Sequence, residues 1–185
     1  MLIEKDKSCL LLVDVQEKLT PFVIDKEKLV ENCHWLLSLA NELAIETFVT
    51  EQYSKGLGHT IELLQPLIKN VTVLDKVSFS VMSDKACAGH LNSLNKSQII
   101  VMGMETSVCV LQTVLELLAM KKQVFIVVDA VSGRHELDGQ LALNRMKQAG
   151  AILVTKEMVF FEWLRTAKVK NFKELSKCYL QGVKE

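Results

Sequence analysis

Residues 9–15 read C-L-L-L-V-D-V, a short apolar run with one carboxylate, Asp14, near its end. The run does not alternate between apolar and polar residues, so it is typical of a strand that is covered on both faces. Such strands belong to parallel sheets, because the crossovers between parallel strands place helices above and below the sheet. The run therefore predicts an α/β fold.

Five further apolar runs of strand length follow, separated by segments with helical spacing. The strands are expected at residues 46–50, 71–74, 98–102, 123–128 and 152–154, and the helices at residues 26–43, 84–94, 106–120, 136–149, 157–166 and 171–180. Asp25, Ser83 and Thr106 are the expected N-caps of the first three helices. Alternating strands and helices imply right-handed crossovers, so we predict a Rossmann-like three-layer α/β/α sandwich with a six-stranded parallel sheet.

Length and composition limit the class of protein. The chain has 185 residues, which suits a single domain over residues 1–185. Its 22 basic and 22 acidic side chains balance, so nothing favours nucleic acid or an anionic membrane as a partner. No segment resembles a signal peptide or a membrane helix. Five cysteines without a C-x-x-C pair argue against a disulfide framework or a zinc site, and they predict a cytoplasmic protein.

Three side chains of catalytic type fall at the predicted carboxyl ends of strands, where α/β sheets bind their ligands. Asp14 lies near the end of the first strand, Lys76 just after the third, and Cys109 in the first turn of the helix after the fourth. A thiol nucleophile must lose its proton, and the leaving group must gain one, so a carboxylate and an ammonium beside a thiol suit nucleophilic catalysis. The three residues are therefore candidates for one catalytic site.

Each candidate also has an ordinary structural interpretation. Cys109, in a helix capped by Thr106, would have its thiolate favoured by the helix N-terminus and by Lys76, yet most free cysteines pack as small hydrophobic residues. Glu105 would oppose a thiolate if its charge faced inward. Asp14 is expensive to bury without a partner, unless the strand end lies in water. A lysine after a strand is usually a surface residue, so these alternatives stay open.

Three separated motifs resemble those of the isochorismatase-like cysteine hydrolase superfamily. They are G-M-E-T-S-V-C-V at residues 103–110, L-L-V-D-V-Q at residues 11–16 and L-D-K-V-S-F-S at residues 74–80. Three more segments are similar to its branch of isochorismatase domain-containing proteins: T-E-Q-Y-S-K-G-L-G-H-T at residues 50–60, V-D-A-V-S-G-R at residues 128–134 and A-L-N-R-M-K-Q-A-G-A at residues 142–151. The resemblance covers nearly the whole chain in matching order.

The resemblance implies a catalytic triad in which Cys109 is the nucleophile, Asp14 the general base and Lys76 the supporting cation. It also implies a cis peptide between Met104 and Glu105, which would aim the N–H groups of Glu105 and Cys109 into an oxyanion hole. The fold that it implies is again a six-stranded parallel sheet in a three-layer sandwich. Members of the superfamily commonly form homo-oligomers, so we expect one here.

The chain departs from the metal-binding members of the superfamily after the second strand. Nicotinamidases carry Asp-x-His there, with a further His later in the chain, whereas this chain has Gln52, Tyr53 and Ser54. His59 by itself fits an exposed loop histidine. We therefore expect no metal and no cofactor, and nicotinamide is not the expected substrate.

The resemblance implies a metal-independent cysteine hydrolase that acts on a small amide-like or other carbonyl substrate through a covalent acyl-enzyme. The alternative is a catalytically silent relative with an interaction or regulatory role. RNA cleavage, a label attached to some relatives, is disfavoured by the balanced charge. The candidate pocket residues, each of which could equally serve ordinary packing, are Gln16, Phe22, Tyr53, Phe79 and Met82. The candidates for an interface between copies are Phe160, Phe161 and Trp163.

Overall fold

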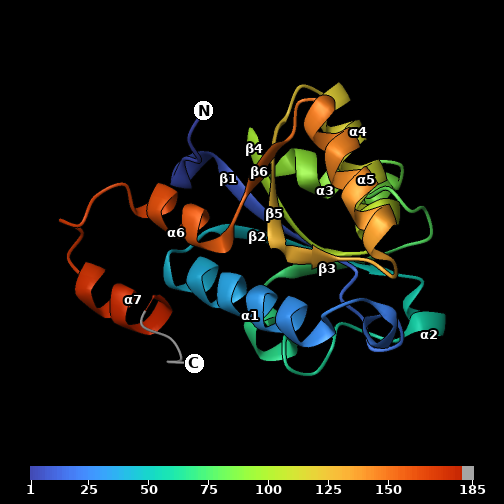
Figure 1. The fold of residues 1–185 in the computed structure, drawn as a ribbon, viewed down its shortest axis with the longest axis horizontal. Coiled ribbons are helices and arrows are strands. Elements are labelled where there is room, and N and C mark those ends of the chain that lie inside the picture. Colours follow the sequence, from blue (N-terminus) through green and yellow to red (C-terminus); the bar gives the residue numbers. More distant parts are fainter. Residues whose placement is uncertain (181–185) are drawn as a thin grey trace.

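The structure, a computed structural model, describes residues 1–180 of the chain. Six parallel strands form one sheet in the order β3-β2-β1-β4-β5-β6 (Figure 1). The strands are β1 Ser8–Val13, β2 Glu46–Gln52, β3 Thr72–Lys76, β4 Gln98–Met104, β5 Gln123–Ser132 and β6 Ile152–Val154. The predicted α/β class and the six-stranded parallel sheet are confirmed.

Helices cover both faces of the sheet, as Figure 1 shows. One face carries α1 (Lys26–Glu42), α6 (Lys156–Leu164) and α7 (Phe172–Tyr179), and the other carries α3 (Lys85–Ser93), α4 (Leu111–Ala119) and α5 (Glu136–Gln148). The short elements are α2 (Ser54–Leu57), a π-helical turn (Thr106–Val110) before α4, and 3-10 turns at Lys5–Lys7, Thr20–Phe22 and Gln65–Ile68. Among residues 1–180, no helix has the length and apolar character needed to span a bilayer.

Both faces of β1 are buried, which explains its continuous apolar sequence. Leu10 and Leu12 pack in the cluster beneath α1 and α6, whereas Leu11 and Val13 pack in the cluster beneath α3 and α4. Every residue of the strand is buried. The central strand therefore contributes to both hydrophobic layers, as the sequence of residues 9–15 predicts.

The ends of the elements differ from the predictions in ways that matter for the site. β2, β4 and β5 run two to four residues further than predicted, so their carboxyl ends lie closer to the catalytic candidates. Thr106 does not cap a regular helix, because the chain makes a π-helical turn there and α-helix begins only at Leu111.

Two predicted helix caps are also wrong. Asp84, not Ser83, caps α3, since its carboxylate accepts the N–H groups of Ala86 and Cys87 at 2.9 and 3.0 Å. Asp25 is the residue before α1. Its backbone is in the left-handed conformation, and its side chain makes no capping hydrogen bond. The prediction that Phe160 and Trp163 lie at an interface between copies is wrong as well, because both are buried in the core beneath α1.

Candidate active site

Asp14 directly follows β1. It lies where the sheet divides into two halves, one extending from β1 through β2 and β3 and the other from β4 through β5 and β6. The residue is fully buried and has a left-handed backbone with a φ of 53°. Its Oδ1 accepts the Thr50 hydroxyl at 2.8 Å, and its Oδ2 accepts the Lys76 ammonium at 2.7 Å. Buried carboxylates need such partners. The interpretation of Asp14 as a solvated strand end is thereby excluded.

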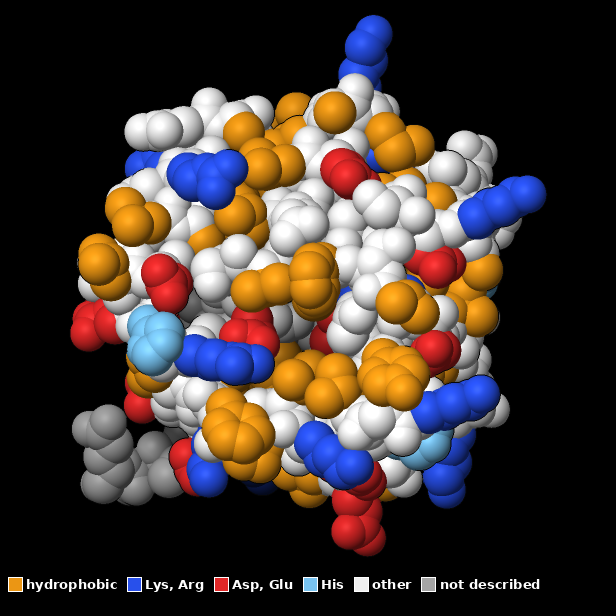
Figure 2. All heavy atoms as spheres, turned by 90° about the vertical axis from the view of Figure 1, so that its right-hand side faces the viewer, with side chains coloured by type: hydrophobic (Ala, Val, Ile, Leu, Met, Phe, Trp, Pro, Cys, Tyr) orange, Lys and Arg blue, Asp and Glu red, His pale blue; other side chains and the backbone are white. Residues whose placement is uncertain are grey.

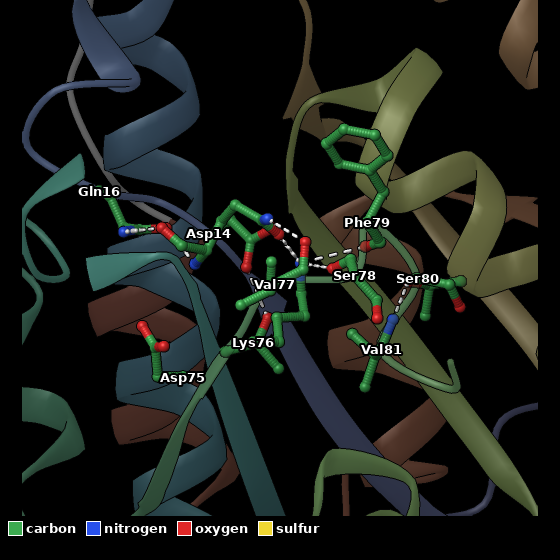
Figure 3. A network of polar contacts seen from close by, with 12 residues as sticks. Asp14, Gln16, Asp75, Lys76, Val77, Ser78, Phe79, Ser80 and Val81 are labelled. Carbon is green, nitrogen blue, oxygen red and sulfur yellow. Dashed lines mark hydrogen bonds and ion pairs between the residues drawn. The ribbon is translucent and has the colours of Figure 1, made fainter. Parts of the chain in front are cut away.

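Lys76 is the last residue of β3, and its ammonium is fully buried. Besides Asp14, it donates to Gln52 Oε1 at 2.7 Å and to the backbone carbonyls of Phe79 at 3.1 Å and Ser78 at 3.3 Å (Figure 3). All of its donor directions are therefore taken by protein acceptors, and Asp14 is the one anion among these partners. Lys76 is not a surface lysine.

Cys109 lies in the π-helical turn after β4 and is 5% exposed. Its thiol lies near the Asp14 carboxylate and the Lys76 ammonium, since both groups act on the pKa of the thiol. The three candidates of the sequence, which come from three distant segments of the chain, thus meet at the carboxyl edge of β3, β1 and β4. A thiol near a carboxylate and an ammonium can lose its proton to the carboxylate, which activates sulfur as a nucleophile.

The resting protonation of this group differs from the sequence expectation. Burial raises the pKa of the Cys109 thiol, and the negative charge of Asp14 raises it further, while Lys76 lowers it only in part. Burial likewise raises the pKa of Asp14 against the opposing effect of Lys76. Burial is the largest of these effects, so it favours the neutral form of the Cys109 thiol, with Asp14 and Lys76 beside it.

Glu105 turns its charge away from the thiol and toward Arg134. The two side chains form a two-point ion pair, with Arg134 Nη2 at 3.0 Å from Oε1 and Arg134 Nε at 2.9 Å from Oε2. The peptide bond between Met104 and Glu105 is cis. The carbonyl of Glu105 accepts the N–H groups of Val108 and Val110, which closes the turn that carries Cys109.

Two glutamines hold the lysine side of the site, and sequence reasoning missed the role of both. Gln52 presents Oε1 to Lys76 while its Nε2 donates to the Val77 carbonyl at 2.7 Å. Gln16 makes two hydrogen bonds with the backbone of Gln52. Its Oε1 accepts the Gln52 N–H at 2.6 Å, and its Nε2 donates to the Gln52 carbonyl at 3.0 Å. Gln16 is fully buried, so it supports the site from inside the protein. It does not line a pocket, contrary to the prediction. The sequence carried no signal for Gln52, because the second strand was predicted to end at residue 50, before it.

The other candidate pocket residues lie in the loops of the same sheet edge. The side chains of Phe22, Tyr53 and Phe79 are more than half exposed, and Met82 is partly buried. A cavity of about 280 Å³ opens on this edge beside Thr106 and Gly133, and none of these four residues lines it.

No cluster of three or more metal-ligating side chains occurs among residues 1–180. His59 is exposed, as predicted, and its Nδ1 lies 2.9 Å from Oε2 of the buried Glu51. That hydrogen bond raises the pKa of His59 above its ordinary value. Glu51 is otherwise occupied by the N–H and hydroxyl of Thr60, so this pair anchors the loop after β2.

Comparison with known proteins places these motifs in a family. Residues 8–158 match the family described as Isochorismatase domain. Isochorismatase domain-containing protein 2 of Danio rerio is 39% identical over 171 residues, which make up 92% of this chain and 85% of that protein. The structure of MAR1 ribonuclease from Caenorhabditis elegans shares 35% identity with a TM-score of 0.91, covering 100% of this chain and 95% of its own.

The same architecture also occurs in a more distant protein. The YcaC gene product of Escherichia coli, an octameric hydrolase of unknown specificity, is 24% identical with a TM-score of 0.87, covering 99% of this chain and 98% of its own. That likeness shows the fold alone. The family match and the identity to the Danio rerio relative, taken with the triad motifs, show that the chain belongs to the isochorismatase family.

Proposed function

We propose that this protein is a metal-independent cysteine hydrolase that cleaves a small amide-like or other carbonyl substrate through a covalent acyl-enzyme. The observation that carries the proposal is the fully buried ion pair of Asp14 with Lys76 beside the Cys109 thiol. Membership of a family of hydrolases supports the reaction class. The ion pairs of Asp14 with Lys76 and of Glu105 with Arg134 are each electrically neutral, which favours an uncharged substrate.

The reaction proceeds in two steps that balance in protons. As the substrate enters, the Cys109 thiol gives its proton to Asp14, and sulfur forms a bond with the carbonyl carbon. The oxyanion is held by the backbone N–H groups of Glu105 and Cys109. The leaving group departs with the proton from Asp14, leaving a thioester. A water molecule then gives a proton to Asp14 and attacks the thioester, and Cys109 regains its proton when the acid is released.

Lys76 has a supporting role in this scheme. Its positive charge stabilises the ionised form of Asp14 before the transfer and the ionised form of Cys109 after it. Because the lysine is buried and held by Gln52 and two carbonyls, it stays in place while the charge moves between carboxylate and sulfur.

Selective alkylation of Cys109 tests the proposal. We expect iodoacetamide, in a Cys178→Ser background that removes the exposed cysteine, to label Cys109 and to leave Cys9, Cys33 and Cys87 unlabelled in mass spectra of the digested protein. These three are internal controls, because burial also raises their thiol pKa values, to about 12 for Cys9 and Cys87. Asp14→Asn should slow the labelling of Cys109 by about tenfold or more, because loss of the proton acceptor outweighs loss of a negative charge that raises the pKa of the thiol.

A screen of small amides and esters, scored against Cys109→Ala, would then identify turnover that depends on the thiol. Equal labelling of the four buried cysteines, or labelling that Asp14→Asn does not change, would overturn the assignment of an activated nucleophile. A Cys109 that stays unreactive from pH 6 to pH 9, together with a stable protein partner, would instead support the silent, regulatory alternative.

RNA cleavage is not the activity that the chain favours, although three of the similar solved structures carry the name MAR1 ribonuclease. The formal net charge is zero, and phosphate backbones are bound through an excess of basic side chains. We place the protein in the cytoplasm, a reducing compartment, because its five cysteines are all free thiols.

A further inference from the structure

The segment that follows β3, residues 77–83, supplies two of the acceptors that hold Lys76. The carbonyls of Ser78 and Phe79 both face the ammonium (Figure 3). Beyond them, Ser80 and Val81 are almost fully buried, with 1% and 0% of their surface exposed. The position of the lysine therefore depends on how firmly this segment is fixed, which β3 alone does not ensure because it is an edge strand.

Side chains of α4 fix the segment at three points. Thr113 Oγ1 accepts the backbone N–H of Val81 at 3.0 Å. Glu116 Oε2 accepts the Ser80 hydroxyl at 2.7 Å, and both carboxylate oxygens of Glu116 accept the Ser83 hydroxyl at 2.9 and 3.0 Å. Ser80 Oγ in turn accepts the N–H of Met82 at 3.1 Å. Glu116 thus holds the segment on both sides of the Val81 contact.

The helix that holds the segment is also the continuation of the turn that carries the nucleophile. Cys109, Thr113 and Glu116 are spaced i, i+4 and i+7, the spacing that places side chains along one side of a helix. The sulfur and the support of the lysine are therefore attached to the same rigid element. We propose that Glu116 is a positioning residue that, through Ser80 and Ser83, sets Lys76 against Asp14 and Cys109. The inference rests on the proposed function, since it assigns Glu116 a task only where Cys109 reacts.

The chemistry of the contacts indicates which substitutions separate positioning from folding. Glu116→Ala removes both acceptors, whereas Glu116→Gln keeps one carbonyl oxygen and the same shape. Gln112 lies one helical turn before Glu116 and is exposed on the same helix, so Gln112→Ala is a matched control. Ser80→Ala with Ser83→Ala removes the two donors and leaves the carboxylate in place.

The experiment measures the rate of Cys109 alkylation by iodoacetamide between pH 6 and pH 10 in the full chain carrying Cys178→Ser. Glu116→Ala should slow alkylation at pH 7.5 by about three- to tenfold and move the pH midpoint upward, because a displaced Lys76 no longer favours the ionised Asp14 and thiolate. Glu116→Gln should recover most of the rate, and Gln112→Ala should match the parent. A purely structural residue would lower the melting temperature without moving the midpoint.

Coupling to the two serines completes the test. Ser80→Ala with Ser83→Ala should reproduce the shift, and combining these changes with Glu116→Ala should add nothing further, because all act on one contact. If Glu116→Ala does not fold, the serine pair alone decides. Suppose that Cys109 of the parent protein remains selectively labelled. Unchanged pH midpoints of alkylation in the folded variants, or fully additive effects, would then overturn the proposal for Glu116. Loss of selective labelling in the parent would overturn the proposed function and this inference together.

Discussion

The Lys76 ammonium and the Asp14 carboxylate form a buried pair whose members depend on each other. Removing one charge leaves the other without its counter-charge in a site where neither side chain has any exposed surface. The acid–base behaviour of the site therefore follows from this pair. Asp14 has to be ionised to receive the thiol proton, and its pKa is already raised by burial.

Lys76→Met tests this dependence at the level of a single charge. Lys76 lowers the pKa of Asp14, so its loss should raise that pKa further and reduce the ionised fraction at any given pH. The acid limb of the rate of Cys109 alkylation should move to higher pH, and the rate on that limb should fall by about tenfold for each unit of the shift. Lys85→Met, at the exposed first residue of α3, is the control for the loss of a lysine. An acid limb that does not move would show that Lys76 does not tune the base.

Some residues of the site could be predicted from the sequence and others could not, for identifiable reasons. Asp14 is conspicuous because a carboxylate interrupts an apolar run, and its burial with a cation follows from electrostatics. Cys109 and Lys76 gained their roles from the family motifs, since a lone thiol or lysine has an ordinary structural use. Gln52 gave no signal, because an uncharged amide at a strand end looks the same whether it faces solvent or a buried lysine.

At the scale of elements, the six strands and every helix except α2 followed from periodicity, whereas their ends did not. The apolar period is set by which face is covered, and that is common to a whole element. An end depends on single side chains: Ser83 and Asp84 are both good caps in sequence, and only the folded chain shows that Ser83 is engaged by Glu116. The π-helical turn before α4 adds one residue to a turn, a change that an apolar pattern does not register.

The cap of α3 offers a direct test at this scale. Asp84→Ala removes an acceptor for two N–H groups at the start of the helix, so we expect the free energy of unfolding to fall by about 1 kcal/mol. Asp84→Asn keeps a side-chain oxygen in the same place and should lose clearly less. Denaturation by urea, followed by circular dichroism, measures both. Equal losses in the two variants would argue that the hydrogen bonds from Ala86 and Cys87 do not stabilise the helix.

At the scale of the whole molecule, exposed apolar side chains gather on one face. Figure 2 shows them across the middle of the side on which α2 lies in Figure 1. The loops after β1, β2 and β3 expose Phe22 at 66%, Tyr53 at 53% and Val77 at 73% of their full surface. Exposed apolar side chains on one face favour association. We therefore propose a homo-oligomer whose contacts lie near the catalytic edge, and not at the buried Trp163.

Sedimentation equilibrium tests this proposal. The protein should have a mass at least twice that of the 20.8 kDa chain, and Phe22→Ser combined with Val77→Ser should weaken the association. Met120→Ser, at an exposed methionine where α4 ends on the opposite edge of the sheet, should leave the mass unchanged. A monomer at tens of micromolar concentration would contradict the proposal.

The place of β3 in the sheet has a consequence for how the site fails. β3 is an edge strand, paired on one side by β2, and four of its five residues are exposed or only partly buried. Edge strands of this kind open by local fluctuation at a lower free energy than the central strands. Because Lys76 ends β3, each such opening separates the lysine from Asp14 while β1 and β4 stay folded. Backbone amide exchange should therefore be faster in β3 than in β1, and the free energy of that local opening, lower than that of global unfolding, would set the temperature at which the pair of Asp14 and Lys76 is lost.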